Sequence, residues 1–108
     1  MAREQEPGGM DLLILHLLSE RDMYGYEMVI ELANRSSEVF QMKEGTLYPL
    51  LHRLEKEGSV SAYEEKKDGR VRRYYHLTRK GGEKLRERTE AWERYAGAVN
   101  AVLCTAPV

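Results

Sequence analysis

The sequence predicts a mostly α-helical single domain that contains one two-stranded β-hairpin and ends in a long helix. Three observations predict this class. Apolar residues recur at helical spacing through most of the 108 residues. A stretch around "KKDGRV" changes to strand-forming residues on either side of an Asp-Gly turn. Residues 82–103 keep an apolar stripe at intervals of seven.

Composition is that of a soluble globular protein, with 32% charged and 42% hydrophobic residues. No apolar run approaches the roughly 20 residues that cross a bilayer, and the first ten residues lack the apolar stretch of a secretory signal. Cys104 is the only cysteine, which excludes an intramolecular disulfide and fits a reducing compartment. We therefore expect a cytoplasmic protein.

Two helices are predicted on either side of "RDMYGYE". Residues 1–9 are polar and end in Pro-Gly-Gly, which predicts a flexible tail, and residues 10–20 are apolar on nearly all sides, which is typical of a central helix. A second helix is predicted over residues 24–36, where Gly25 favours either a close helix approach or a turn. Its apolar stripe consists of Tyr26, Val29, Ile30 and Ala33, widened by Met28 and Leu32.

A third helix is predicted from about Thr46, with Gly58 as its left-handed terminator. This start makes Thr46 the N-cap and places Pro49 in the first turn, where the missing N–H costs no hydrogen bond. A start one full turn earlier would instead let Pro49 kink the helix. The apolar face consists of Leu47, Leu50, Leu51 and Leu54.

Residues 60–65 and 71–77 are predicted strands joined by the turn "KDGR". Alternation places Val71, Tyr75 and Leu77 on one face and Arg72, Tyr74 and His76 on the other. Residues 66–80 contain seven Lys or Arg and one Asp, whereas the rest of the chain carries a net −7. Such asymmetry is typical of a polyanion contact on an otherwise acidic body, and a solvated loop is the alternative.

The last predicted helix begins at Thr78, as its cap, or at Gly82, and continues to Leu103. At about 1.5 Å per residue it is longer than a body of this size can cover. An apolar stripe that projects in this way requires a partner, and a second copy of the chain is the simplest. The stripe consists of Leu85, Trp92 and Val99, together with Thr89, Ala96 and Leu103.

In order, these parts predict a winged helix-turn-helix: a mostly α fold with a two-stranded β-wing and one long C-terminal dimerisation helix. The expected divisions are a tail over residues 1–9, a DNA-binding domain over 10–78, and the dimerisation helix with a short tail over 79–108. In this fold the third helix enters the major groove, and the wing lies along the backbone or in the minor groove. The third helix presents Tyr48, Pro49, His52, Arg53 and Lys56 opposite its leucines.

Two of these assignments have structural alternatives. Arg53 and Lys56 are otherwise expected to be solvated charges that pair with Glu57 and Glu44. Tyr48 is otherwise expected to pack against the hairpin.

The stretches "LLILHLL", "YGYEM", "GTLYPLLHRLEKEG" and "GRVRRYYHLTRKG" cover roughly residues 12–82 and together resemble the PadR family of bacterial transcriptional regulators. The similarity is greatest to its short members with a single C-terminal helix. It implies a homodimeric cytoplasmic repressor that joins the nucleoid through a pseudo-palindromic operator. It also implies release from DNA by a small aromatic or lipophilic effector. One departure is Ser59-Val60, where the family usually has a bulky aliphatic pair.

The resemblance assigns DNA contacts to three segments. In the third helix they are Thr46, Tyr48, Pro49 and Arg53, and the exposed face of that helix adds His52 to the expected contacts. In the wing they are Lys66, Lys67, Arg70, Arg72 and Arg73. At the start of the second helix they are Tyr24 and Tyr26.

The resemblance also implies an effector cavity at the dimer interface that is lined by Trp92. A tryptophan has a large flat face, and two copies across a two-fold axis would enclose a planar ring. The alternative is that Trp92 fills the interface without any ligand. In either case its expected neighbours are Tyr95, Ala96, Val99 and Leu103.

Other classes of function lack support in the sequence. The three histidines are scattered over separate elements and there is one cysteine, so no metal site is predicted. Cys104 has no basic neighbour that would activate its thiol. No phosphate-binding loop or nucleophile with a base is present, so we expect neither an enzyme nor a cofactor. The remaining alternative is a winged-helix module for protein–protein contact, which would not need the basic hairpin.

Overall fold

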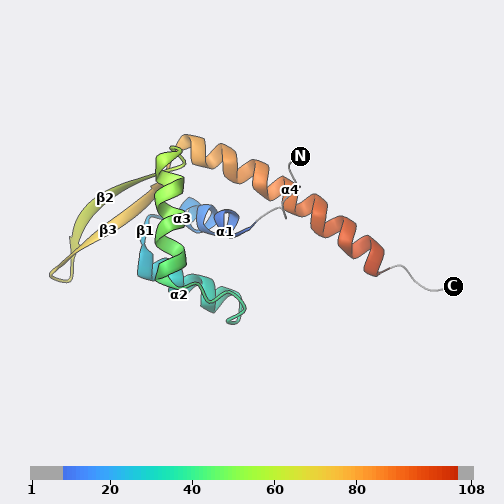
Figure 1. Cartoon of the computed structure of the whole chain (residues 1–108), viewed down its shortest axis with the longest axis horizontal. Coiled ribbons are helices and arrows are strands. Elements are labelled where there is room, and N and C mark those ends of the chain that lie inside the picture. Colours follow the sequence, from blue (N-terminus) through green and yellow to red (C-terminus); the bar gives the residue numbers. More distant parts are fainter. Residues whose placement is uncertain (1–8, 105–108) are drawn as a thin grey trace.

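The computed structural model describes residues 9–104, which form four helices and a three-stranded antiparallel sheet (Figure 1). The predicted mostly α fold with a long C-terminal helix is confirmed. In chain order the elements are α1 (Met10–Glu20), β1 (Met23–Tyr24), α2 (Gly25–Arg35), α3 (Glu44–Lys56), β2 (Val60–Lys67), β3 (Arg70–Leu77) and α4 (Arg79–Leu103). The two expected tails lie almost entirely outside the described residues. No helix in the described part of the chain is long and apolar enough to cross a membrane.

The core lies where α1, α2 and α3 meet the base of the sheet, and α1 is central to it as predicted. Burial of each of its leucine side chains contributes about 2 kcal/mol, so these helices form one rigid frame. The buried apolar residues are Ile14, Leu15, Leu17, Leu18, Met23, Met28, Leu32, Met42, Leu47, Leu50, Leu51, Leu54, Val60 and Tyr75.

The side of α2 that faces the core is rotated by part of a turn from the predicted side. Met28 and Leu32 are buried, whereas Tyr26 and Ile30 are exposed. The cause is a close approach at Gly25, where a Cβ atom would overlap the ring of Tyr48. Two stripes in this segment match the helical spacing, and the packing of Tyr48 over Gly25 selects the one that contains Met28. Of the two predicted uses of Gly25, the close approach is the observed one.

Helix α3 begins at Glu44, two residues before the predicted start, and its N-cap is Lys43. The carbonyl of Lys43 accepts from the backbone N–H groups of Thr46 and Leu47, so Thr46 lies within the helix and is not its cap. Pro49 is consequently inside the helix and not in its first turn. It removes the N–H that would otherwise bond to the carbonyl four residues earlier. Gly58, with φ +84°, terminates the helix as predicted.

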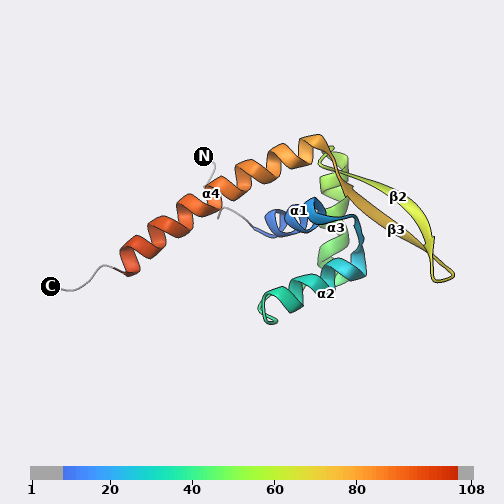
Figure 2. The same ribbon diagram turned by 180° about the vertical axis from the view of Figure 1, so that it is seen from behind.

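Strands β2 and β3 form the predicted hairpin and are paired from Val60 opposite Leu77 to Lys67 opposite Arg70. Asp68 and Gly69 form the turn, both with positive φ, which is the conformation that suits the twist of a hairpin. The hairpin extends from one end of the molecule while α4 leaves at the other (Figure 2).

The third strand, β1, was not predicted. It contains only Met23 and Tyr24, which pair with Tyr75 and Tyr74 of β3 and make the order β1-β3-β2. Two residues are too few for alternation to be detected. Because β1 covers the far side of β3, Tyr74 is buried as well as Tyr75, whereas Val71 near the tip is exposed.

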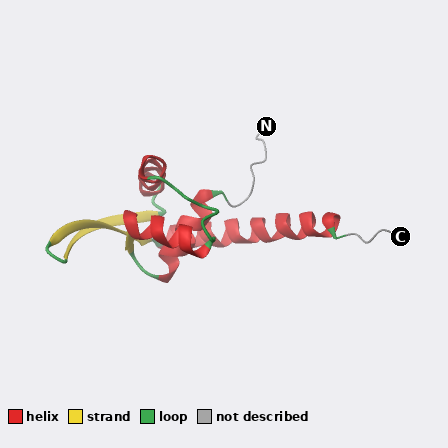
Figure 3. Cartoon of the chain, turned by 90° about the horizontal axis from the view of Figure 1, so that it is seen from below, coloured by secondary structure: helices red, strands yellow, loops and turns green. Residues whose placement is uncertain are grey.

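Helix α4 is joined firmly at its first turn and projects beyond the body of the molecule (Figure 3). Thr78 caps it as predicted, because its hydroxyl accepts from the N–H of Gly81 at 3.0 Å and donates to the carbonyl of Gly58 at 2.6 Å. Gly81 packs directly on the backbone of Ser59. After Gly81, no described residue of α4 is buried.

Candidate nucleic-acid interface

The face of α3 opposite its leucines is a continuous exposed polar surface, as predicted. It consists of Thr46, Tyr48, Pro49, His52, Arg53 and Lys56. The expected alternative pairing of Arg53 or Lys56 with Glu57 is not formed, because Glu57 pairs with Lys84 at 2.7 Å. Both cations therefore end in solvent next to the aromatic and imidazole side chains, which is a suitable composition for contacts with phosphates and base edges.

Tyr48 is only half exposed, because its ring crosses Gly25 at the start of α2. Burial, together with the charge of Glu44 and the phenol of Tyr75 on β3, raises the pKa of the Tyr48 hydroxyl. The hydroxyl is therefore a protonated hydrogen-bond donor at neutral pH. The observed packing of Tyr48 is on Gly25 of α2, whereas the expected alternative was packing against the hairpin; the remaining surface of Tyr48 stays open to solvent.

The tip of the hairpin carries three exposed cations, Lys66, Lys67 and Arg70. Lys67 lies opposite Arg70 in the strand register, so two like charges face each other across the end of the wing. Such a pair is unfavourable in the free protein and is relieved by a polyanion. In the described part of the chain no carboxylate forms an ion pair with any of these three side chains.

The other two wing cations are held by the protein itself. Arg73 lies on the α3 side of the hairpin, where its Nη2 is 3.2 Å from Glu55 Oε2. Arg72 lies on the opposite face, with its guanidinium carbon 4.4 Å from the centre of the Tyr24 ring. The Arg72 Nε is buried without a hydrogen-bond partner among the described residues. Of the five residues predicted to contact DNA from the wing, Lys66, Lys67 and Arg70 form no ion pair among the described residues. Arg72 and Arg73 contact other side chains of the protein.

Behind Arg72, an aromatic column fixes the base of the wing. Tyr24 meets the ring of Tyr74 edge-on at 5.4 Å, and Tyr74 stacks on Tyr63 at 5.7 Å. The Tyr63 hydroxyl donates to Asp22 at 2.6 Å, which raises the pKa of Tyr63 to about 12, and His76 contacts the same carboxylate. Sequence reasoning missed Asp22 and Tyr63, because their pairing depends on β1. Tyr24 is therefore packed in this column, whereas Tyr26 is exposed on α2.

Between α3 and the wing lies an open groove of about 290 Å³. Its lining residues are His52, Glu55, Lys56 and Arg73. Glu55 places one negative charge among the basic groups, so the groove is not uniformly positive. A polyanion that entered it would compete with Glu55 for Arg73.

Comparison with known proteins identifies the class to which this geometry belongs. Residues 14–87, from α1 into α4, match the model of the transcriptional regulator PadR-like family. The chain belongs to the PadR-like family. Its members are DNA-binding transcriptional regulators and not enzymes, as the sequence predicted.

Individual relatives of this PadR-like chain support the same family assignment. A transcriptional regulator of Mycobacterium tuberculosis is 35% identical over 97 residues, which is 90% of this chain and 88% of that protein. A protein of Lysinibacillus sphaericus is 43% identical over 86 residues, 79% of each chain. The crystal structure of a PadR-like regulator of Bacillus cereus superposes with a TM-score of 0.82 at 33% identity, covering 92% of this chain and 95% of that one.

The PadR-like chain has a second cavity, of about 460 Å³, between α1, the end of α2 and α4. Helix α4 contributes Thr89 and Trp92, and Trp92 is 43% exposed with its ring 5.8 Å from that of Tyr95. The other predicted neighbours, Ala96, Val99 and Leu103, lie farther along the helix and do not line the cavity. The remaining lining residues are Leu12, Leu13, His16, Leu17, Leu32, Arg35, Ser36 and Phe40.

Proposed function

We propose that this PadR-like regulator is a homodimeric repressor that binds a pseudo-palindromic operator. The observation that carries the proposal is that one chain has both three exposed cations at the wing tip and an exposed polar face on α3. The residues outside 66–80 carry a net negative charge, so the positive charge is concentrated at the wing. Residues 10–78 bind DNA and residues 79–108 dimerise. The protein acts in the bacterial cytoplasm and on the nucleoid when bound.

On the operator, α3 lies in the major groove and the wing follows the phosphate backbone. Tyr48, His52 and Arg53 contact base edges, since they occupy the exposed face of the helix, and Thr46 and Pro49 flank them. Lys66, Lys67 and Arg70 contact phosphates. Tyr26, on the exposed side of the first turn of α2, contacts the backbone where the positive end of a helix favours an anion. Tyr24, Arg72 and Arg73 position these groups.

Dimerisation through α4 is supported by the exposed apolar residues along its outer part. Trp92, Tyr95, Val102 and Leu103 are all exposed in the single chain. A small soluble protein rarely leaves an apolar surface of this extent uncovered, and such a surface marks an interface. The α4 helix of a second copy supplies an apolar stripe of the same period and would cover it.

A mobility-shift experiment on DNA from upstream of the protein's own gene tests the proposal. We expect a sequence-specific complex that contains two protein chains and persists in excess random DNA. The protein–protein module, which is the rival function, predicts no shift of either DNA even in dilute buffer. That outcome would end the proposal.

The Trp92 cavity supports a second function, release of the repressor by a planar aromatic or lipophilic molecule. Its volume falls within the usual range for small-molecule sites. The lining combines leucines with the polar groups of Arg35, His16 and Ser36. A ligand in this position would contact α1 and α4 together, and so would alter how the dimerisation helix meets the DNA-binding domain.

Because Trp92 is the only tryptophan, fluorescence reports on the surroundings of this one residue. Titration with proflavine and with 4-hydroxybenzoate is expected to quench it with at least one of the two. Trp92→Phe should then need about fivefold more of that compound to release DNA, since one aromatic contact contributes about 1 kcal/mol. Unchanged fluorescence with both classes would leave Trp92 as a packing residue of the interface.

Replacement of Glu55 by Gln tests the groove between α3 and the wing. The change frees Arg73 and removes a negative charge close to the expected path of the phosphates. We expect affinity for operator and random DNA to rise by about threefold, with a steeper salt dependence. Fluorescence anisotropy at several salt concentrations measures both quantities. Equal affinity at every salt concentration would show that the groove does not face DNA.

A further inference from the structure

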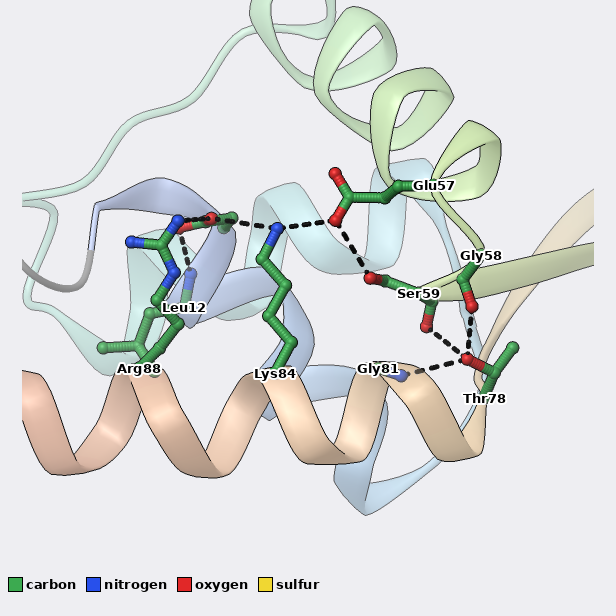
Figure 4. A network of polar contacts seen from close by, with 9 residues as sticks. Leu12, Glu57, Gly58, Ser59, Thr78, Gly81, Lys84 and Arg88 are labelled. Carbon is green, nitrogen blue, oxygen red and sulfur yellow. Dashed lines mark hydrogen bonds and ion pairs between the residues drawn. The ribbon is translucent and has the colours of Figure 1, made fainter. Parts of the chain in front are cut away.

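Four charged residues connect α4 to two other helices, and we call them the α4 bridge: Asp11, Glu57, Lys84 and Arg88. Figure 4 labels Glu57, Lys84 and Arg88. Lys84 Nζ lies 2.7 Å from Glu57 Oε1 and 3.7 Å from Asp11 Oδ2. Arg88 Nη2 lies 2.9 Å from the same Asp11 oxygen. Lys84 is thus the residue that links a carboxylate of α1 with the carboxylate at the end of α3.

The bridge is more sheltered than a surface ion pair. The side chain of Asp11 is only 8% exposed and that of Lys84 is 21% exposed. The side chain of Glu57 is 33% exposed, and loss of Lys84 would leave this half-buried carboxylate without its ion-pair partner. The hydrogen bond from Lys84 also lowers the pKa of the Glu57 carboxyl group, against the effect of burial, so Glu57 is charged at neutral pH.

The bridge occupies the junction between the two functional halves of the chain. Glu57 is the C-cap residue of α3, and it also accepts a hydrogen bond from the buried Ser59 at 3.1 Å. Ser59 in turn contacts Gly81 of α4 through its backbone. This accounts for the unusual residue before Val60, since a hydroxyl here joins the polar network. The junction fixes the direction in which α4 leaves the body relative to the axis of α3.

In the proposed dimer this direction has a large effect at the DNA. The chain from Lys84 to Leu103 is about 28 Å of helix, so a tilt of about 10° at the bridge moves the far end by about 5 Å. One base pair of DNA corresponds to a rise of about 3.4 Å and a rotation of about 35°. A small change of angle at the junction therefore moves the end of α4 by more than the rise of one base pair, and would change the distance between the two DNA-binding domains by a comparable amount.

We propose that the α4 bridge sets the separation of the two half-sites that the dimer accepts, and that Lys84 is its positioning residue. The inference rests on the proposed dimeric DNA-binding function and deepens it. The bridge contacts no DNA. It acts by holding each recognition helix at a fixed angle to the helix that joins the two copies.

Selection from a pool of random-sequence duplex DNA tests this inference and does not require a known operator sequence. The bound DNA is sequenced for the wild type and for Lys84→Met, which keeps an unbranched side chain but removes the charge. The wild type is expected to enrich paired half-sites with one spacing. The variant should enrich the same half-site sequence with several spacings, and its preference for the best spacing over a neighbour should fall from about tenfold to about threefold or less.

Three further proteins make the result specific. Arg94→Met removes one charge from the side of α4 away from the apolar stripe and should keep the single spacing. Lys84→Arg keeps a cation within reach of both carboxylates and should restore it. Glu57→Gln cuts only the link to α3, and should broaden the spacing even if Lys84→Met proves too unstable to test. Affinity for a single half-site should remain within about twofold of the wild type in all of them.

The outcomes separate the inference from the function on which it rests. A wild type that enriches no paired half-sites would overturn the proposed dimeric operator binding. A wild type with one spacing, together with Glu57→Gln and any folded Lys84→Met protein that keep that spacing, would overturn the role of the bridge alone. Broadening by Arg94→Met to the same degree would also overturn it, since general charge loss would then suffice.

Discussion

Val99→Glu is expected to convert the proposed dimer into a monomer that binds its operator at least about 100-fold more weakly, because bivalent attachment to the two half-sites is lost. Val99 is half-buried in the single chain and lies seven residues beyond Trp92 on the stripe of α4. A dimer with two-fold symmetry presents the same surface twice, so each substitution introduces two carboxylates into the interface. Burial of an unpaired carboxylate is strongly unfavourable, and the helix itself tolerates glutamate well.

Sedimentation analysis and operator affinity measure the two parts of this prediction. Ala101→Glu is the matched control, because it adds the same charge two positions farther along, on the exposed side of α4 opposite the stripe. It should remain dimeric and bind DNA within about twofold of the wild type. If Val99→Glu also remained dimeric, the interface would lie on another surface of the chain.

Replacement of Lys67 and Arg70 together by alanine is expected to weaken binding to operator and random DNA by a similar factor, about 10- to 100-fold at moderate salt. Both residues lie at the wing tip, where they face each other across the strands. Loss of two phosphate contacts should reduce the slope of log affinity against log salt by about 1.8 for each protomer. Discrimination between operator and random DNA should change little, since phosphates carry no direct sequence information.

Dissociation constants at four or more salt concentrations, on both DNAs, measure this slope. The control is the double variant Arg86→Ala with Arg94→Ala, which removes the same charge from exposed positions of α4. An equal reduction of the slope by the α4 pair would indicate a general effect of net charge. A slope unchanged by the wing pair would remove the tip from the interface.

The parts of the fold that the sequence predicted correctly depend on short-range chemistry. The leucine face of α3, the Thr78 cap, the Gly58 terminator and the Asp-Gly turn each follow from residues within a few positions of one another. The start of α3 was placed too late because Thr46 is a good capping residue in isolation. The carbonyl of Lys43 begins the hydrogen-bond series earlier, with Pro49 tolerated inside the helix.

The features that were missed join residues far apart in the chain. The stacking of Tyr63 on Tyr74, the ion pair of Arg73 with Glu55 and the α4 bridge all depend on the meeting of separate elements. With eighteen acidic and seventeen basic residues in the sequence, charge alone does not indicate which pairs form. For the same reason the sequence predicted five wing cations as DNA contacts, whereas among the described residues Arg73 pairs with Glu55 and Arg72 lies over Tyr24. The DNA and effector contacts themselves remain predictions.

The packing of Gly81 against the Ser59 carbonyl has a consequence for genetic screens. Any side chain at position 81 would force the first turn of α4 away from the body. If the protein acts as the proposed repressor, such a mutant would leave its target gene derepressed although every residue proposed to contact DNA is intact. Loss-of-repression alleles at this glycine would therefore act by displacing α4 and not by removing a DNA contact. They should be left out when the operator-binding surface is mapped from random mutants.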